Sequence, residues 1–136
     1  MTKSANAVPE GFHTVTPYLV VPGVAKLIDF LKQAFDAQEV ERHLRPDGTV
    51  QHAEVRIGDS IIMMGEPQPP QKSMPAMILL YVADTDTLYK RALEAGATSV
   101  REPADQPYGD RTGGVEDSCG NQWWVATRIA KAGSAV

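Results

Sequence analysis

The sequence predicts an α+β fold made of two βαβββ modules, and three observations lead to it. Two segments of the chain resemble each other at a shift of about 61 residues. Each copy holds an amphipathic pattern in which apolar residues recur every three or four positions, as on one face of a helix. Short β-branched and aromatic runs, bounded by turn signals, surround both patterns. The length of 136 residues fits a single domain with an ordinary core.

The internal repeat aligns "TPYLVVPGVAKLIDFLKQAFDAQEV" with "MILLYVADTDTLYKRALEAGATSV". Val21 falls on Val82 and Leu27 falls on Leu88 at this shift. The ends of the two copies match as well, because "SIIMM" lies over "NQWWV". The chain therefore contains one supersecondary unit twice.

In the first module we expect a strand over residues 14–21, which are rich in β-branched and aromatic side chains. An amphipathic helix follows, with its apolar stripe at Val24, Leu27, Ile28, Leu31 and Phe35. Strands over residues 39–45 and 50–57 flank "PDG", a hairpin turn signal. "GDS" then turns the chain into a strand over residues 61–64.

In the second module Asp84 is placed to cap a helix, and Gly96 is placed to end it in the left-handed conformation. We expect module one over about residues 14–66 and module two over about residues 76–129. Residues 66–75 join them, and their four prolines favour an extended, semi-rigid connector.

The composition excludes several classes of protein. Net charge is −4 and the pI is about 5.3, without a cluster of lysine or arginine, so nucleic acid is not an expected partner. One cysteine cannot form an intrachain disulfide or a CxxC metal knuckle. The N-terminus lacks an apolar signal region, and no segment approaches 18 apolar residues, so no membrane partner is expected either. We expect a cytoplasmic protein.

Four segments, "TPYLVV", "IDFLKQAF", "HAEVRIGDSIIMM" and "YGDRTGGVEDSCGNQWWVAT", resemble the vicinal oxygen chelate superfamily. This group contains glyoxalases, bleomycin-resistance proteins and ring-cleaving dioxygenases. The last two segments are similar to its PhnB-like branch. The resemblance covers about residues 14–129 and implies βαβββ modules whose curved mixed sheets enclose a cavity, commonly in a homodimer.

Metal-dependent members of this superfamily hold a divalent ion with His and Glu or Gln side chains on the first and last strands of each module. Carried over by the resemblance, these positions are Thr16, Met63, Met77 and Trp124. Thioether sulfur is a soft ligand, and an indole offers no lone pair. We therefore expect neither a metal at these positions nor another cofactor. This argues against metal-dependent catalysis but leaves open whether the chain is an enzyme.

The same positions predict the lining of a ligand cavity, because side chains alternate across a strand. The predicted ligand-binding residues are Thr16, Tyr18, Met63, Met77, Tyr81, Tyr108, Arg111 and Trp124. Trp123 is expected on the helix side instead. Met and aromatic side chains suit a small-molecule site, and the alternative is that they fill a closed core.

Two alternatives stay open for the loop before the seventh strand. Arg111 either pairs with Asp110 to hold a turn, or reaches over the cavity mouth with Tyr108 to meet an anionic or carbonyl-bearing ligand. Cys119 is expected in a plain turn, since no histidine lies near it in the sequence to activate a nucleophile.

"HAE" places His52 and Glu54 on one strand face, about 7 Å apart along the strand. They are the candidate catalytic residues, either sharing a metal or acting as a general acid-base pair. The alternative is a polar strand face on which Glu54 pairs with Arg56 or with a cross-strand partner. His13 and His43 are expected on the surface.

Three functions from different classes follow. The first, which we favour, is a metal-free protein that binds an aromatic or conjugated small molecule in an apolar cavity. The second is a lyase, isomerase or dioxygenase whose metal has moved to His52 and Glu54. The third is an assembly module with a filled cavity. The expected partners are a small-molecule ligand and a second copy of the chain.

Overall fold

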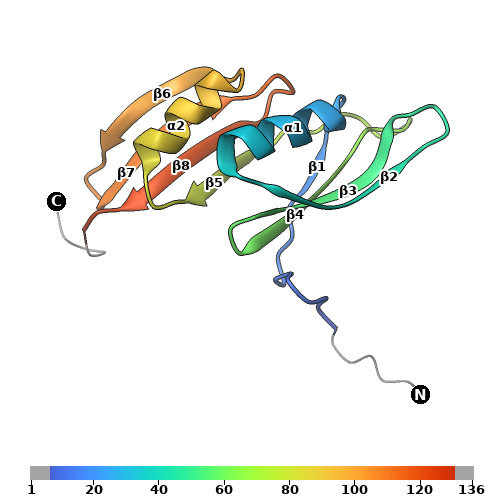
Figure 1. The fold of residues 1–136 in the computed structure, drawn as a ribbon, viewed down its shortest axis with the longest axis horizontal. Helices are drawn as coiled ribbons and strands as arrows, with labels where there is room; N and C mark the ends of the chain where they lie inside the picture. The colour runs from blue at the N-terminus through green and yellow to red at the C-terminus, as the bar shows by residue number, and fades with distance from the viewer. Residues whose placement is uncertain (1–6, 131–136) are drawn as a thin grey trace.

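A computed structural model describes residues 7–130 and shows two modules with the same order of elements (Figure 1). The first consists of β1 (Tyr18–Val20), α1 (Val24–Phe35), β2 (Gln38–Leu44), β3 (Val50–Ile57) and β4 (Ser60–Gly65). The second consists of β5 (Met77–Tyr81), α2 (Thr85–Glu94), β6 (Thr98–Asp105), β7 (Asp110–Glu116) and β8 (Gln122–Arg128). The α+β fold with two βαβββ modules is confirmed.

Each module forms its own four-stranded mixed sheet. The strand orders are β1-β4-β3-β2 and β5-β8-β7-β6, in which the first two strands are parallel and the other neighbours antiparallel. Tyr18 pairs with Met63 in the first sheet, and Leu79 pairs with Trp124 in the second. Both members of the second pair lie 61 positions after those of the first. The repeat in the sequence is therefore a repeat in strand register.

The two helices join the modules. Figure 1 shows α2 over the second sheet and α1 beside it toward the first sheet, and the two helices make the most extensive contact between the modules. The Phe35 ring lies 5.8 Å from that of the fully buried Trp123, and Arg91 of α2 donates a 2.8 Å hydrogen bond to Asp36 beyond α1. Trp123 faces the helix side, as predicted. Within the described residues, neither helix has the length or apolar character needed to span a bilayer.

Helix boundaries follow the local chemistry of the chain. The side chain of Asp84 accepts a 3.1 Å hydrogen bond from the Thr87 N–H, so it caps α2 as predicted. Gly96 follows the end of that helix with a φ of 112°, a conformation that favours glycine. The apolar stripe of α1 is buried along the whole helix, which fixes its orientation on the first sheet.

The first strand is shorter than the predicted span of residues 14–21. Pairing begins at Tyr18 because Pro17 has no N–H to donate, although its carbonyl still accepts a 3.0 Å hydrogen bond from the Met63 N–H. The hydroxyl of Thr16 donates to the His13 carbonyl at 3.2 Å and holds the preceding segment in a turn.

The connector between the modules is not extended throughout. Gln71 donates a backbone hydrogen bond to Gln68 at 2.9 Å, which closes a turn. Further on, the Met74 N–H donates to the Val20 carbonyl at 2.6 Å and forms an isolated bridge along the outer edge of β1. The proline-rich segment therefore covers part of an edge that would otherwise be free to pair.

Candidate ligand-binding faces

Each sheet packs one face against the helices, and no other described element covers its second face. We call the uncovered faces the N-terminal and C-terminal open faces. The N-terminal open face carries Tyr18, Glu41, His43, His52, Glu54 and Met63. The C-terminal open face carries Met77, Leu79, Tyr81, Arg101, Thr112, Gly114, Gln122 and Trp124.

Large apolar side chains of β5 are exposed on the C-terminal open face. Met77 is 65% exposed and Tyr81 is 62% exposed, with Leu79 between them. Ile78 and Leu80 alternate with them and pack against the core. The strand thus offers an apolar surface that residues 7–130 leave exposed.

The indole of Trp124 lies over the backbone of Gly114 on the neighbouring strand. A Cβ at position 114 would sit 2.7 to 2.8 Å from three ring carbons, so the absence of a side chain there is what allows the ring to take this position. The indole N–H donates to the Gln122 side chain at 3.0 Å, and the Arg101 guanidinium lies 5.7 Å from the ring centroid. Indole, amide and guanidinium together form a surface suited to a planar polar ligand.

Tyr81 is fixed at one end of this surface by a buried acid. Its hydroxyl donates to Asp110 at 2.7 Å, and the same carboxylate pairs with Arg128. The Arg128 hydrogen bond, reinforced by the Tyr81 hydroxyl, holds the pKa of Asp110 below its usual value. Asp110 therefore stays ionised near neutral pH and keeps the Tyr81 ring in place.

The proposed pairing of Asp110 with Arg111 is wrong. Neighbouring residues of a strand point to opposite faces, and Arg111 points toward the helix side of the sheet. There it pairs with Asp86 of α2 at 2.6 Å and with Asp105 at the end of β6 at 2.9 Å. These partners raise the pKa of Arg111. Tyr108 lies exposed in the turn before β7. Arg111 thus lies away from the open face on which we expected it.

Ionisable side chains gather on the N-terminal open face. The Tyr18 hydroxyl lies 3.1 Å from Nδ1 of His52, and Nε2 of His52 lies 3.0 Å from the Glu54 carboxylate. Glu54 therefore pairs with His52 and not with Arg56. Glu41 lies directly across from Glu54 on β2, and His43 stacks on His52 with centroids 6.4 Å apart. His52 and Glu54 share one face, as their spacing predicted.

Among the ionisable residues of these faces, Glu41, His43 and Arg101 are absent from the predicted set of site residues. Glu41 and His43 reach the open face because the pairing of β2 with β3 shifts between Glu39 and Glu41, which the sequence does not reveal. Arg101 reaches Trp124 across β7, in a strand whose pairing is also irregular. The stretch around it, "TSVRE", carries no signal that singles Arg101 out, because Glu102 follows it directly and such charged pairs are common on exposed strands.

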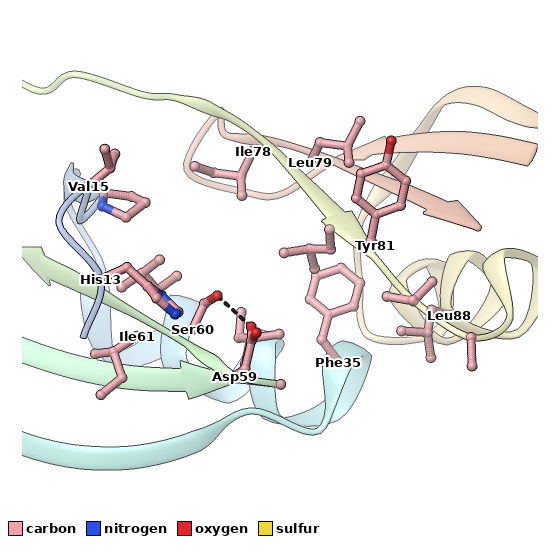
Figure 2. Close-up of a pocket in the computed structure, with 17 residues that line it drawn as sticks. His13, Val15, Phe35, Asp59, Ser60, Ile61, Ile78, Leu79, Tyr81 and Leu88 are labelled. Atoms are coloured by element: carbon pink, nitrogen blue, oxygen red, sulfur yellow. Dashed lines mark hydrogen bonds between the residues drawn. The ribbon is translucent and has the colours of Figure 1, made fainter. Parts of the chain in front are cut away.

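A groove of about 830 Å³ runs between the two sheets (Figure 2). Figure 2 shows Leu79 and Tyr81 of β5 on one side and His13 with Val15, from the segment before β1, on the other. Phe35 closes the groove at the end of α1. The lining is mostly apolar, and it continues the exposed surface of β5 toward the first module.

Cys119 lies in the turn between β7 and β8, as expected. Its thiol contacts the Pro22 carbonyl at 3.2 Å, and its N–H donates to Asp117 at 2.8 Å. Burial, together with the nearby Asp117 charge, raises the pKa of the Cys119 thiol. The thiolate that a nucleophile needs is therefore disfavoured.

Comparison with known proteins identifies the family. A family model described as the Glyoxalase/Bleomycin resistance protein/Dioxygenase superfamily matches residues 11–125. The chain belongs to this superfamily. Relatives include the uncharacterised proteins Mb0911c of Mycobacterium bovis and Rv0887c of Mycobacterium tuberculosis. Each is 42% identical over 120 residues, which cover 80% of this chain and 79% and 71% of the respective relatives.

Solved structures of other proteins share the fold. TioX from Micromonospora sp. ML1 is 24% identical with a TM-score of 0.72, covering 86% of this chain and 99% of TioX. The fosfomycin resistance protein FosX from Mesorhizobium loti is 19% identical with a TM-score of 0.61, covering 85% and 91% of the two chains. At these identities the likeness concerns the fold.

The four positions that the resemblance assigns to a metal, Thr16, Met63, Met77 and Trp124, do not suit a divalent ion. The Thr16 hydroxyl is engaged with the His13 carbonyl, and the Trp124 N–H with Gln122. Met63 and Met77 present thioether sulfur, which a hard divalent ion does not prefer. No step of a reaction can be assigned to a metal at these four positions.

Proposed function

We propose that this protein binds a planar, conjugated small molecule on the C-terminal open face, without a metal at the four superfamily positions. The observation that carries the proposal is the indole of Trp124, which lies over Gly114 beneath the guanidinium of Arg101. An indole face offers stacking area, and the exposed Met77 and Tyr81 side chains extend the apolar surface beside it. The adjoining groove gives such a ligand room.

The charge of Arg101 favours a ligand with an anionic or carbonyl group. Within residues 7–130, no carboxylate lies within 4.0 Å of its guanidinium, whereas Arg111 is held by two aspartates. An arginine stacked on an aromatic ring keeps its N–H donors in the plane of the guanidinium, where a carboxylate can accept two of them. Arg101 therefore takes the polar role that the sequence suggested for Arg111.

The test uses two probes of the same shape, 2-naphthoate and naphthalene-2-carboxamide, with binding measured by titration calorimetry. Trp124→Ala should weaken both by about tenfold or more, since it removes stacking and apolar area together. Arg101→Met should weaken 2-naphthoate more than the carboxamide. Arg56→Met, an exposed arginine on the other sheet, is the control. Failure of both probes to bind, or equal binding by Trp124→Ala, would refute the proposal.

We further propose that two copies associate so that each open face gains a second wall. Support comes from the apolar side chains that one chain leaves exposed, because a contiguous apolar surface of this kind is typical of association sites. Sedimentation velocity of the full chain should show a dimer. Met77→Glu should shift it to monomer, while Leu44→Glu, an exposed leucine at the end of β2, should not. A monomer at all concentrations, or a dimer that survives Met77→Glu, contradicts this.

A module with a filled, closed cavity is not favoured by the geometry. The side chains that would have to fill such a cavity, among them Met77 and Tyr81, are mostly exposed within the chain. They are held in place by neighbours on their own sheet and not by core packing, as the Tyr81 hydrogen bond to Asp110 illustrates.

A further inference from the structure

The N-terminal open face contains a set of metal-ligating side chains from two neighbouring strands. His52 and Glu54 come from β3, and Glu41 comes from β2 directly across from Glu54. One ligand atom from each of the three lies within 4.8 Å of the other two. The third ligand that the sequence could not name is thus supplied by the strand pairing.

Electrostatics on this face favours a cation. Two glutamates that face each other across antiparallel strands repel one another. Within the described part of the chain, the only groups within 4.0 Å that could offset the charges of Glu41 and Glu54 are His43 and His52, which carry charge only when protonated. A divalent ion among the three ligand atoms would offset both carboxylates at once.

The ligands are also held from outside, by side chains that would not touch the ion. With Nε2 of His52 on a metal, its Nδ1–H can donate to the Tyr18 hydroxyl 3.1 Å away, which fixes the ring and its tautomer. Glu41 has a similar partner, because Nε2 of His43 lies 2.9 Å from its carboxylate. Such outer partners orient the ligands of established metal sites.

The three ligand side chains differ in their exposure to solvent. The Glu54 side chain is 13% exposed and that of His52 is 26% exposed, while that of Glu41 is 44% exposed. The inner ligands are therefore partly shielded, and the remaining coordination positions face the open side of the sheet. An arrangement with three protein ligands and open positions is typical of metals that act on a substrate.

We propose that Glu41, His52 and Glu54 bind one first-row divalent cation of the zinc, cobalt, iron or manganese type. One imidazole and two carboxylates suit these ions better than Mg²⁺ or Ca²⁺, which prefer oxygen ligands alone. The site lies one strand away from the superfamily position, since Glu54 pairs with Met63 on β4. It is independent of the ligand surface around Trp124, which belongs to the other sheet.

The test is titration of the purified, metal-free full chain with Co²⁺, followed by the visible absorption of the bound ion and by metal content after dialysis. One Co²⁺ per chain is expected. Glu54→Gln, Glu41→Gln and His52→Ala should each weaken binding by tenfold or more. Glu116→Gln, an exposed glutamate on β7, is the matched control and should bind like the unaltered chain.

Further variants separate this site from the other proposal and from general loss of structure. Tyr18→Phe should weaken Co²⁺ binding by about 10- to 100-fold while leaving the fold intact, since it removes only an outer partner. Trp124→Ala should leave Co²⁺ binding unchanged. The proposal is overturned if no Co²⁺ binds at millimolar concentration, or if Glu54→Gln and His52→Ala, shown by circular dichroism to be folded, bind as the unaltered chain does.

Discussion

A single methyl group at position 114 would collide with the indole of Trp124. The Cβ of alanine would lie 2.7 to 2.8 Å from three ring carbons, whereas carbon atoms in good contact are about 3.5 Å apart or more. The ring therefore has to rise by roughly 0.7 Å or swing off the strand. Gly114 does not have a positive φ, so alanine is compatible with the backbone and the clash is the dominant effect.

Displacing the ring should weaken the binding of 2-naphthoate by about two- to twelvefold, which corresponds to a stacking contribution of about 0.5 to 1.5 kcal/mol. Titration calorimetry measures this, and tryptophan fluorescence reports the ring itself, because Trp123 is fully buried and Trp124 is not. Gly113→Ala is the matched control, since its Cβ points to the helix side, 3.2 Å from Pro103. Unchanged binding and fluorescence in Gly114→Ala, with the chain still folded, would refute the reasoning.

Three other predictions concern buried or paired groups. Asp117→Ala leaves the buried Trp123 N–H without its 2.8 Å acceptor and removes three more hydrogen bonds, so urea unfolding should show a loss of roughly 3 kcal/mol. Asp110 has a lowered pKa because of Arg128, so its stabilisation is present at neutral pH and is lost as pH falls below about 4. The difference in Tm between Asp110→Asn and the unaltered chain should accordingly shrink on acidification, and a constant difference would contradict this. Cys119 should react with iodoacetamide more slowly in the native chain than in urea, because burial raises its pKa; equal rates would argue against it.

Much of the fold is readable from the sequence because its signals are local. Asp84 and Gly96 mark the ends of α2 by capping chemistry alone, and the shift of 61 residues carries the strand register of the first module into the second. The expected start of β1 is too early, because the pattern of residues 14–21 does not show that Pro17 interrupts the pairing. The β-branched and aromatic residues indicate a strand in this segment, and the strand is shorter than they suggest because Pro17 has no N–H to donate.

The site is readable only in part, because it depends on which side chains meet across strands. Alternation places Met77 and Trp124 on one face without any knowledge of tertiary structure. The same rule places Asp110 and Arg111 on opposite faces. The expected ion pair between them is inconsistent with this alternation. Glu41 could not have been found this way, since a register shift in β2 decides which of its residues face Glu54.

The equivalence of the two modules has a consequence for how such a chain can diversify. Glu54 pairs with Met63, and Gly114 pairs with Trp124, so Glu54 and Gly114 occupy equivalent positions of the two modules. The first module has a carboxylate at this position, whereas the second has no side chain there and the Trp124 ring lies over the backbone. Neither residue contributes to the surface of the other sheet. Substitutions can therefore introduce ionisable side chains on one sheet of a duplicated unit and aromatic side chains on the other, without either set affecting the other. A chimera built from two N-terminal halves would carry the Glu41, His52 and Glu54 set twice and would have no counterpart of Trp124 over a glycine.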